Sequence, residues 1–123
     1  MEDKIKLAIV GSRTITSNEV FIKEISVYLQ AQNIKFDNLV IISGGAKGID
    51  SLAEAWANEN NVPTIIYKPD YSNHGRSAPL VRNKIIAKEC THMLALWDGV
   101  STGTIHVTKE ASKLSKHVTI VTC

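Results

Sequence analysis

Short apolar runs alternate along the chain with segments whose apolar residues recur at helical spacing. The runs are too short for helices and stop near turn residues, which is typical of strands buried in a sheet. We expect strands over residues 6–10, 39–42, 64–67, 93–97 and 118–121. Between them, the spacing predicts helices that begin near Ser17 or Asn18, at Ile49, near Ala78 and near Thr104, with a long polar loop over 68–77.

Strands that are apolar throughout and alternate with amphipathic helices indicate a parallel sheet covered on both faces. Such strands are joined by right-handed crossovers that run through the helices. A chain of 123 residues is long enough for one hydrophobic core and too short for two. The sequence therefore predicts an α/β fold: a single Rossmann-like three-layer sandwich over 1–123, with a five-stranded, mainly parallel sheet.

The composition is that of a globular protein, with 44% hydrophobic residues, 21% charged residues and a formal net charge of +2. This small charge does not by itself indicate a nucleic-acid surface. Residues 1–6 carry charges of both signs and lack the pattern of a signal peptide, so we expect a cytoplasmic protein with no membrane partner. The cysteines and histidines lack the spacing of metal ligands, so we expect neither a metal site nor a cofactor.

Small-residue loops follow three of the expected strands: GSR at 11–13, SGGAKGID at 43–50 and WDGVSTGT at 97–104. In a parallel sheet, ligands bind outside the carboxyl ends of the strands. Glycines there let backbone N–H groups approach an anion at a helix N-terminus. Loops of this kind facing one crevice predict a site for phosphate groups. The second loop is not a P-loop, because Lys47 precedes its glycine and no Ser or Thr follows.

Two carboxylates and one histidine stand close to these loops. Asp50 fits two roles, since a carboxylate at that position either caps the following helix or accepts hydrogen bonds from ribose hydroxyls. Asp98 is a second carboxylate for ribose hydroxyls. His106 comes just after the third loop and is the histidine with a possible functional role.

Four motifs together resemble the SLOG superfamily: GSR at 11–13, SGGAKGID at 43–50, RN at 82–83 within RNKIIA, and WDGVSTGT at 97–104. The superfamily contains the Lonely Guy phosphoribohydrolases, DNA-processing protein A and the YspA/YpsA-related proteins, and the resemblance covers almost the whole chain. It implies a nucleotide-type ligand whose phosphate or ribose is reached by the arginine of the RN motif. The candidate ligand-binding residues are Gly11, Ser12, Arg13, Ser43, Gly44, Gly45, Lys47, Asp50, Arg76, Arg82, Asn83, Asp98, Gly99, Ser101, Gly103 and Thr104.

The chain departs from the Lonely Guy pattern at the position of the catalytic glutamate. That glutamate stands three residues after the motif threonine, and counting from Thr104 the position holds Val107. Glu110 lies about one helical turn further along and is a poor substitute. Cleavage of an N-glycosidic bond needs a placed carboxylate to stabilise an oxocarbenium-like transition state. We therefore expect no catalytic residue and favour a binding protein over an enzyme.

Three functions fit these residues. The first is non-catalytic binding of a nucleotide-derived signal of the ADP-ribose or cyclic ADP-ribose type, by a sequestering protein or a sensor module. The second is a Lonely Guy-like nucleotide phosphoribohydrolase in which Asp98, Asp50 or Glu110 replaces the missing glutamate. The third is single-stranded DNA binding, as in DNA-processing protein A.

The expected partners follow from the charge pattern and the size of the chain. Because the basic residues form no groove with interleaved aromatics, nucleic acid is not an expected partner. A nucleotide-derived small molecule is expected instead. We also expect a homodimer or a higher even oligomer, since a small domain often buries more surface by two-fold pairing.

Overall fold

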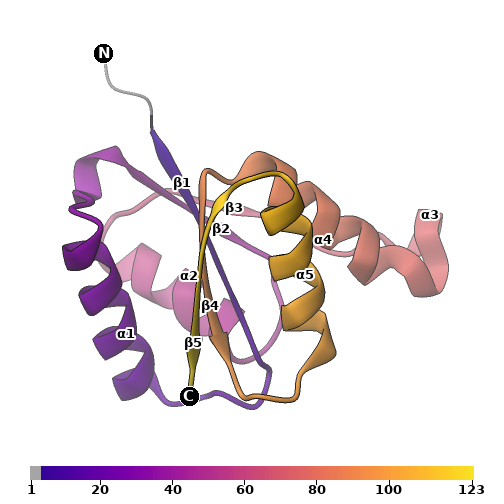
Figure 1. Cartoon of the computed structure of the whole chain (residues 1–123), viewed down its shortest axis with the longest axis horizontal. Coiled ribbons are helices and arrows are strands. Elements are labelled where there is room, and N and C mark those ends of the chain that lie inside the picture. Colours follow the sequence, from indigo (N-terminus) through magenta and orange to yellow (C-terminus); the bar gives the residue numbers. More distant parts are fainter. Residues whose placement is uncertain (1–3) are drawn as a thin grey trace.

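Five strands form one sheet at the centre of the protein (Figure 1). The computed structural model describes residues 4–123, so the first part of the N-terminal charge pattern lies outside the described residues. The strands are β1 (Ile5–Gly11), β2 (Leu39–Ser43), β3 (Thr64–Ile66), β4 (His92–Trp97) and β5 (His117–Thr122). They are ordered β3-β2-β1-β4-β5, and every neighbouring pair is parallel. The predicted Rossmann-like α/β fold is confirmed, with a sheet that is parallel throughout.

Helices cover both faces of the sheet and complete the three layers (Figure 1). On one face lie α1 (Asn18–Ala31) and α2 (Ile49–Glu59), and on the other lie α4 (Ala78–Glu89) and α5 (Thr102–Lys113). Each face has its own apolar core. None of the helices within residues 4–123 is long and apolar enough to cross a membrane.

Two short helical turns lie where a polar loop was expected: α3 (Tyr71–His74) and η2 (Gly75–Ser77). A separate short turn, η1 (Phe36–Asn38), lies between α1 and β2. Figure 1 shows α3 at the outer end of α4. The Asp70 carboxylate caps α3 by accepting hydrogen bonds from the backbone N–H of Asn73 at 3.3 Å and its side-chain amide at 2.6 Å. The prediction of a loop over 68–77 was therefore wrong for residues 71–77. A helix of a single turn is too short for apolar residues to recur at helical spacing, so the sequence pattern could not reveal it.

β1 lies in the middle of the sheet, between β2 and β4. The chain runs outward from β1 through β2 to β3 and then returns to the other side of β1 with β4. The loop after β1 leads to one face of the sheet, and the loop after β4 leads to the other. A crevice between such loops, at the carboxyl ends of the strands, is where doubly wound sheets bind ligands.

Gly11 ends β1 at this crevice, and the absence of a side chain there is needed for packing. A Cβ on Gly11 would lie 2.5 Å from Ile49 Cγ1 and 2.6 Å from the carbonyl oxygen of Leu96. We predict that Gly11→Ala lowers the free energy of unfolding by about 1 to 3 kcal/mol, the usual cost of overpacking a core. Urea unfolding measures this loss. Gly103→Ala is the matched control, because a Cβ there meets no atom within 4 Å; equal losses in the two variants would contradict the packing argument.

Candidate functional site

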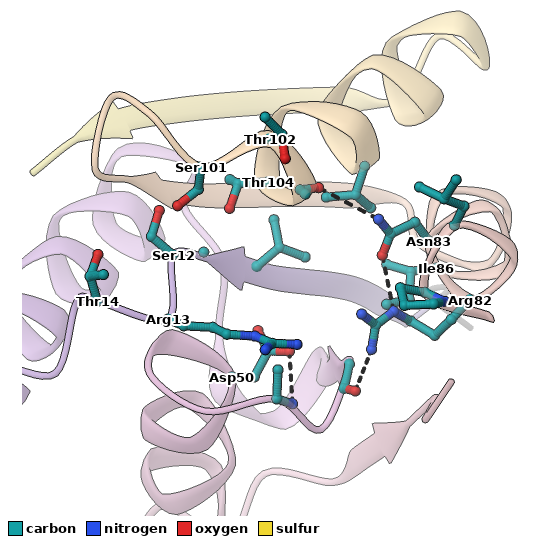
Figure 2. A pocket seen from close by; sticks show the side chains of 18 residues that line it. Ser12, Arg13, Thr14, Asp50, Arg82, Asn83, Ile86, Ser101, Thr102 and Thr104 are labelled. Carbon is teal, nitrogen blue, oxygen red and sulfur yellow. Dashed lines mark hydrogen bonds between the residues drawn. The ribbon is translucent and has the colours of Figure 1, made fainter. Parts of the chain in front are cut away.

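A cavity of about 400 Å³ opens at the crevice, within the size range of ligand pockets (Figure 2). It lies between the loops after β1 and β2 and the N-terminal parts of α4 and α5. The residues expected from the sequence that line it are Gly11, Ser12, Arg13, Gly44, Asp50, Arg82, Asn83, Ser101, Gly103 and Thr104. Segments far apart in the sequence therefore meet around one space.

The other expected site residues lie outside this lining: Ser43, Gly45, Lys47, Arg76, Asp98 and Gly99. Ser43 is buried, and its hydroxyl donates to Glu54 Oε2 at 2.7 Å, which ties α2 to the end of β2. The other four residues are exposed and lie in loops, turns or a short helix: Gly45, Lys47, Arg76 and Gly99.

Asp98 joins the loop after β4 to the loop after β1. Its carboxylate accepts hydrogen bonds from the backbone N–H groups of Val100 (2.9 Å) and Ser101 (2.8 Å) and from the hydroxyls of Ser101 and Thr14, both at 2.8 Å. The N–H of Asp98 donates to Ser12 Oγ at 3.0 Å. The backbone N–H donors hold the pKa of Asp98 well below its usual range. Both carboxylate oxygens are engaged, so Asp98 organises the two loops around the cavity.

We predict that Asp98→Asn lowers the melting temperature at neutral pH, because the amide cannot accept all of these hydrogen bonds. A carboxylate whose pKa is lowered by folding stabilises the fold above its unfolded pKa of about 3.9 and loses that effect as the pH falls through the folded pKa. The wild type and the variant should therefore converge in acid. Asp37→Asn, at an exposed position in η1, serves as the control. A constant difference between wild type and Asp98→Asn down to strongly acid pH would contradict the role given to the charge.

The N-terminus of α5 faces the cavity without a side-chain cap. Ser101 is the N-cap residue, and its hydroxyl donates to Asp98 Oδ2 instead of accepting from the first helical turn. The N–H groups of this turn belong to Thr102, Gly103 and Thr104, which line the cavity. Uncapped N–H groups and the positive end of the helix dipole attract an anion.

Arg82 reaches the cavity from α4 and is half-buried. Its Nη1 donates to the carbonyl oxygen of Gly44 at 2.5 Å, and its Nε donates to Asn83 Oδ1 at 2.9 Å. Burial lowers the pKa of Arg82, and the charge of Asp50 opposes this shift. Within residues 4–123, no carboxylate forms an ion pair with its guanidinium. A half-buried cation without an ion-pair partner favours the binding of an anion.

Gly44 makes the approach of Arg82 possible. A Cβ on Gly44 would lie 2.6 Å from Arg82 Nη1 and 2.8 Å from Asp50 Oδ2. A larger residue at this position would displace the guanidinium or the carboxylate. The absence of a side chain at Gly44 therefore lets Arg82 lie against the loop backbone.

Arg13 brings a second guanidinium to the cavity. Figure 2 shows its exposed side chain extended across the opening toward Asp50. The positive charge of Arg13 is close enough to contribute to the lowered pKa of Arg82. Asp50 is the acidic residue of the lining, so the described residues place two cations against one carboxylate. The cavity carries an excess of positive charge.

Asp50 holds the loop after β2 in shape. Its carboxylate is buried, at 6% exposure, and accepts a hydrogen bond from the backbone N–H of Ala46 at 3.2 Å. Burial raises the pKa of Asp50, although this hydrogen bond and the charge of Arg82 act in the other direction. The structure thus gives Asp50 a loop-capping role, and its position in the lining is compatible with a contact to ribose.

Several lining residues were missed by the sequence argument: Val10, Thr14, Ala46, Pro79, Leu80, Ile86, Thr102 and Val107. Val10, Ile86 and Val107 are buried and form an apolar part of the wall. Helical spacing could have identified two of these residues. Ile86 follows Asn83, and Val107 follows Thr104, by about one helical turn, so each pair lies on the same face of its helix. Val107, which occupies the position of the Lonely Guy glutamate, therefore lies in the cavity wall.

The parallel sheet of five strands, the helices on both of its faces and the glycine-rich loops at the carboxyl ends of its strands define a Rossmann-like α/β protein. Its residues 5–74 match the family described as "YspA, cpYpsA-related SLOG family". The chain belongs to this SLOG family, as its motifs predict.

This chain is similar to one curated relative and to two solved structures, over part of their lengths. The Gene 61 protein of Mycobacterium phage D29 is 35% identical over 81 residues, which cover 61% of this chain and 65% of the phage protein. DNA processing protein A from Streptococcus pneumoniae has a TM-score of 0.74 at 22% identity, over 95% of this chain and 50% of that one. The Helicobacter pylori protein has a TM-score of 0.69 at 24% identity, over 96% and 65%. The chain spans less than two thirds of the length of each relative.

The expectation that nucleic acid is not a partner is wrong. The Helicobacter pylori structure was described for its single-stranded DNA binding mode. A protein with a fold similar to that of this chain therefore binds single-stranded DNA. The expectation rested on the absence of clustered basic residues with interleaved aromatics along the sequence. That linear pattern does not show that Arg13 and Arg82, which are far apart in the sequence, line one cavity.

Proposed function

We propose that this SLOG domain binds a phosphate-bearing nucleotide or nucleotide-derived small molecule, of the ADP-ribose or cyclic ADP-ribose type, in the cavity at the switch point. The observation that carries the proposal is the half-buried Arg82, which has no carboxylate ion-pair partner among the described residues and lines the same cavity as the uncapped N-terminus of α5. Phosphate groups complement both features.

The cavity wall has a cationic part and an apolar part, which suit the phosphate groups and the ring systems of such a ligand. Arg13, Arg82 and the first turn of α5 supply donors for more than one phosphate, which favours a pyrophosphate over a single phosphate group. The apolar part, formed by Val10, Ile86 and Val107, suits the face of a base or a sugar ring. Asp50 lies between the loops as an acceptor for a ribose hydroxyl.

We further propose that the ligand is held without being cleaved, as in a sequestering protein or a sensor module. An isopropyl group at Val107 in the cavity wall cannot stabilise an oxocarbenium-like transition state. Glu110 is one turn further along α5, beside His106 and Lys113, and is not part of the lining. Asp50 is buried and accepts the N–H of Ala46.

A thermal-shift panel of AMP, ADP-ribose, cyclic ADP-ribose variants and NAD tests the proposal, with chromatography of the recovered ligand. Binding to the folded state alone stabilises it by about 2.7 kcal/mol when the ligand is present at about one hundred times its dissociation constant. We expect stabilisation by a pyrophosphate-bearing compound and its recovery intact. Free base released from a nucleoside monophosphate would instead establish a phosphoribohydrolase, and no stabilisation by any compound would refute nucleotide binding.

Single-stranded DNA is a second candidate ligand. The observation that favours it is the likeness to the Helicobacter pylori protein, described for its single-stranded DNA binding mode. A phosphodiester backbone presents the same anionic groups to Arg13 and Arg82 as a nucleotide does. Oligonucleotides added to the panel distinguish the two, because stabilisation by them alone favours DNA. The even oligomer stays a prediction.

A further inference from the structure

A row of side chains leads from Arg82 away from the cavity and into the contact between α4 and α5. Arg82 Nε donates to Asn83 Oδ1 at 2.9 Å. Asn83 Nδ2 lies 3.1 Å from His106 Nδ1, and His106 Nε2 lies 3.6 Å from Glu110 Oε1. His106 is not in the cavity lining. These contacts couple the cavity arginine to a histidine on the neighbouring helix.

The guanidinium fixes which way the Asn83 amide points. Arg82 can only donate, so the amide oxygen must face it and the amide NH2 must face α5, where it also approaches the carbonyl oxygen of Gly103 at 3.5 Å. His106 Nδ1 must then accept, which places the proton of the neutral imidazole on Nε2, toward Glu110. In this arrangement every donor in the row faces an acceptor, although the 3.6 Å between His106 Nε2 and Glu110 Oε1 is longer than a hydrogen bond.

Protonation of His106 breaks this arrangement. A proton on Nδ1 sets two donors, the imidazole N–H and the Asn83 NH2, against each other at 3.1 Å. Turning the amide over does not relieve the conflict, because the NH2 then faces Arg82 Nε–H. If the amide turns over, Arg82 loses its hydrogen bond to Asn83. If the amide does not turn, the repulsion from His106 displaces the Asn83 side chain that accepts this hydrogen bond, which is one of the contacts that orient Arg82 beside Gly44.

We propose that neutral His106 is a positioning residue for Arg82, acting through Asn83, so that anion binding in the cavity weakens when His106 becomes protonated. This inference rests on the proposed function. Glu110 Oε1, on α5, faces His106 Nε2 and also lies 3.5 Å from Lys113 Nζ, and Arg82, on α4, is linked to His106 through Asn83. Toward the sheet, α5 packs through apolar residues such as Val107 and Ala111.

The direction in which anion affinity changes when His106 is protonated distinguishes a positioning role from simple charge attraction. An imidazolium adds positive charge near the cavity, which by Coulomb attraction alone strengthens anion binding at low pH. Positioning predicts the opposite. ADP-ribose is the probe, because its pyrophosphate is a diester and keeps a constant charge over the range, about pH 5 to 8, in which histidine titrates.

The test measures the dissociation constant of ADP-ribose across this range. We expect the wild type to bind about tenfold more weakly at the acid end, a usual effect of losing one charge-assisted contact. His106→Asn should bind well at both ends, because its side-chain oxygen replaces Nδ1 and does not titrate. His106→Leu should bind weakly at every pH, and the control His117→Asn, at an exposed position on β5, should keep the wild-type profile. Wild-type binding that strengthens or stays constant in acid, or a His106→Asn variant that keeps the pH dependence, would overturn the proposal.

A measurement without ligand decides the positioning role even if ADP-ribose does not bind and the proposed function fails. Nitrogen-15 NMR of the free protein should show the Nε2–H tautomer of His106 at alkaline pH. The Arg82 Nε–H should exchange with solvent faster, relative to His106→Asn at the same pH, as His106 becomes protonated. The Nδ1–H tautomer, or equal exchange in the two proteins throughout, would refute it.

Discussion

Replacing Arg82 with alanine is expected to weaken nucleotide binding by about 1.5 to 3 kcal/mol, or about 10- to 150-fold in Kd. The reason is that the half-buried guanidinium has no carboxylate ion-pair partner among the described residues and lies in the lining beside Gly44. A charge-assisted hydrogen bond to a phosphate is lost with it. Isothermal titration with the compound that stabilises the wild type measures the change.

Two further variants make the Arg82 result specific. Lys84→Ala removes a positive charge from an exposed position on the same helix, and we expect it to leave Kd nearly unchanged. Arg82→Lys keeps the charge but not the planar set of donors, so an intermediate affinity is expected. A Kd for Arg82→Ala equal to that of the wild type, with both proteins folded, would remove Arg82 from the site.

The second large effect is expected for Gly103→Val, which should weaken binding by about 1.5 kcal/mol or more while leaving the fold intact. Gly103 lies in the first turn of α5, where a Cβ meets no atom within 4 Å. Its backbone conformation is outside the left-handed region, and valine is a better helix former than glycine. The added methyl groups therefore enter free space at the edge of the cavity, where they block an anion from the helix N–H groups. Titration and a melting curve on the same sample measure both properties.

Gly45→Val provides the contrast. Gly45 has a φ of +71°, and a Cβ there would face Ile66 and Lys68 at 3.1 Å, away from the lining. This variant should lose stability through backbone strain without directly blocking the cavity. If Gly103→Val binds nucleotide as tightly as the wild type, the N-terminus of α5 is not part of the site.

The fold was predictable because its signals are local. Each strand is a short run rich in apolar residues, although the edge strands β3 and β5 are partly exposed, and each long helix repeats its apolar positions along one face. The start of α1 carried an equally local signal, and the Ser17 hydroxyl does accept the N–H of Val20 at 3.3 Å. The single turn of α3 had no repeat, so the same method missed it.

The site was predictable only in part, because its details depend on residues far apart in the sequence. The glycine-rich loops marked the correct edge of the sheet. The role of Asp98 depends on Thr14, 84 positions away, and no local pattern shows that its oxygens are used within the loops. Arg82 entered through the family resemblance, since an arginine inside a helix is ordinarily a solvated residue. The Asn83 to His106 contact joins two helices and has no local pattern of its own.

The central claim is that the cavity holds an intact phosphate-bearing nucleotide. The most direct test is to incubate the purified protein with a cell extract supplemented with ADP-ribose, cyclic ADP-ribose variants and a short single-stranded oligonucleotide, re-isolate it, and identify by mass spectrometry what heat releases. The account predicts an intact nucleotide with a pyrophosphate from the wild type and little or none from Arg82→Ala. Release of no phosphate-bearing molecule from the wild type, or of free base and ribose phosphate alone, would contradict it.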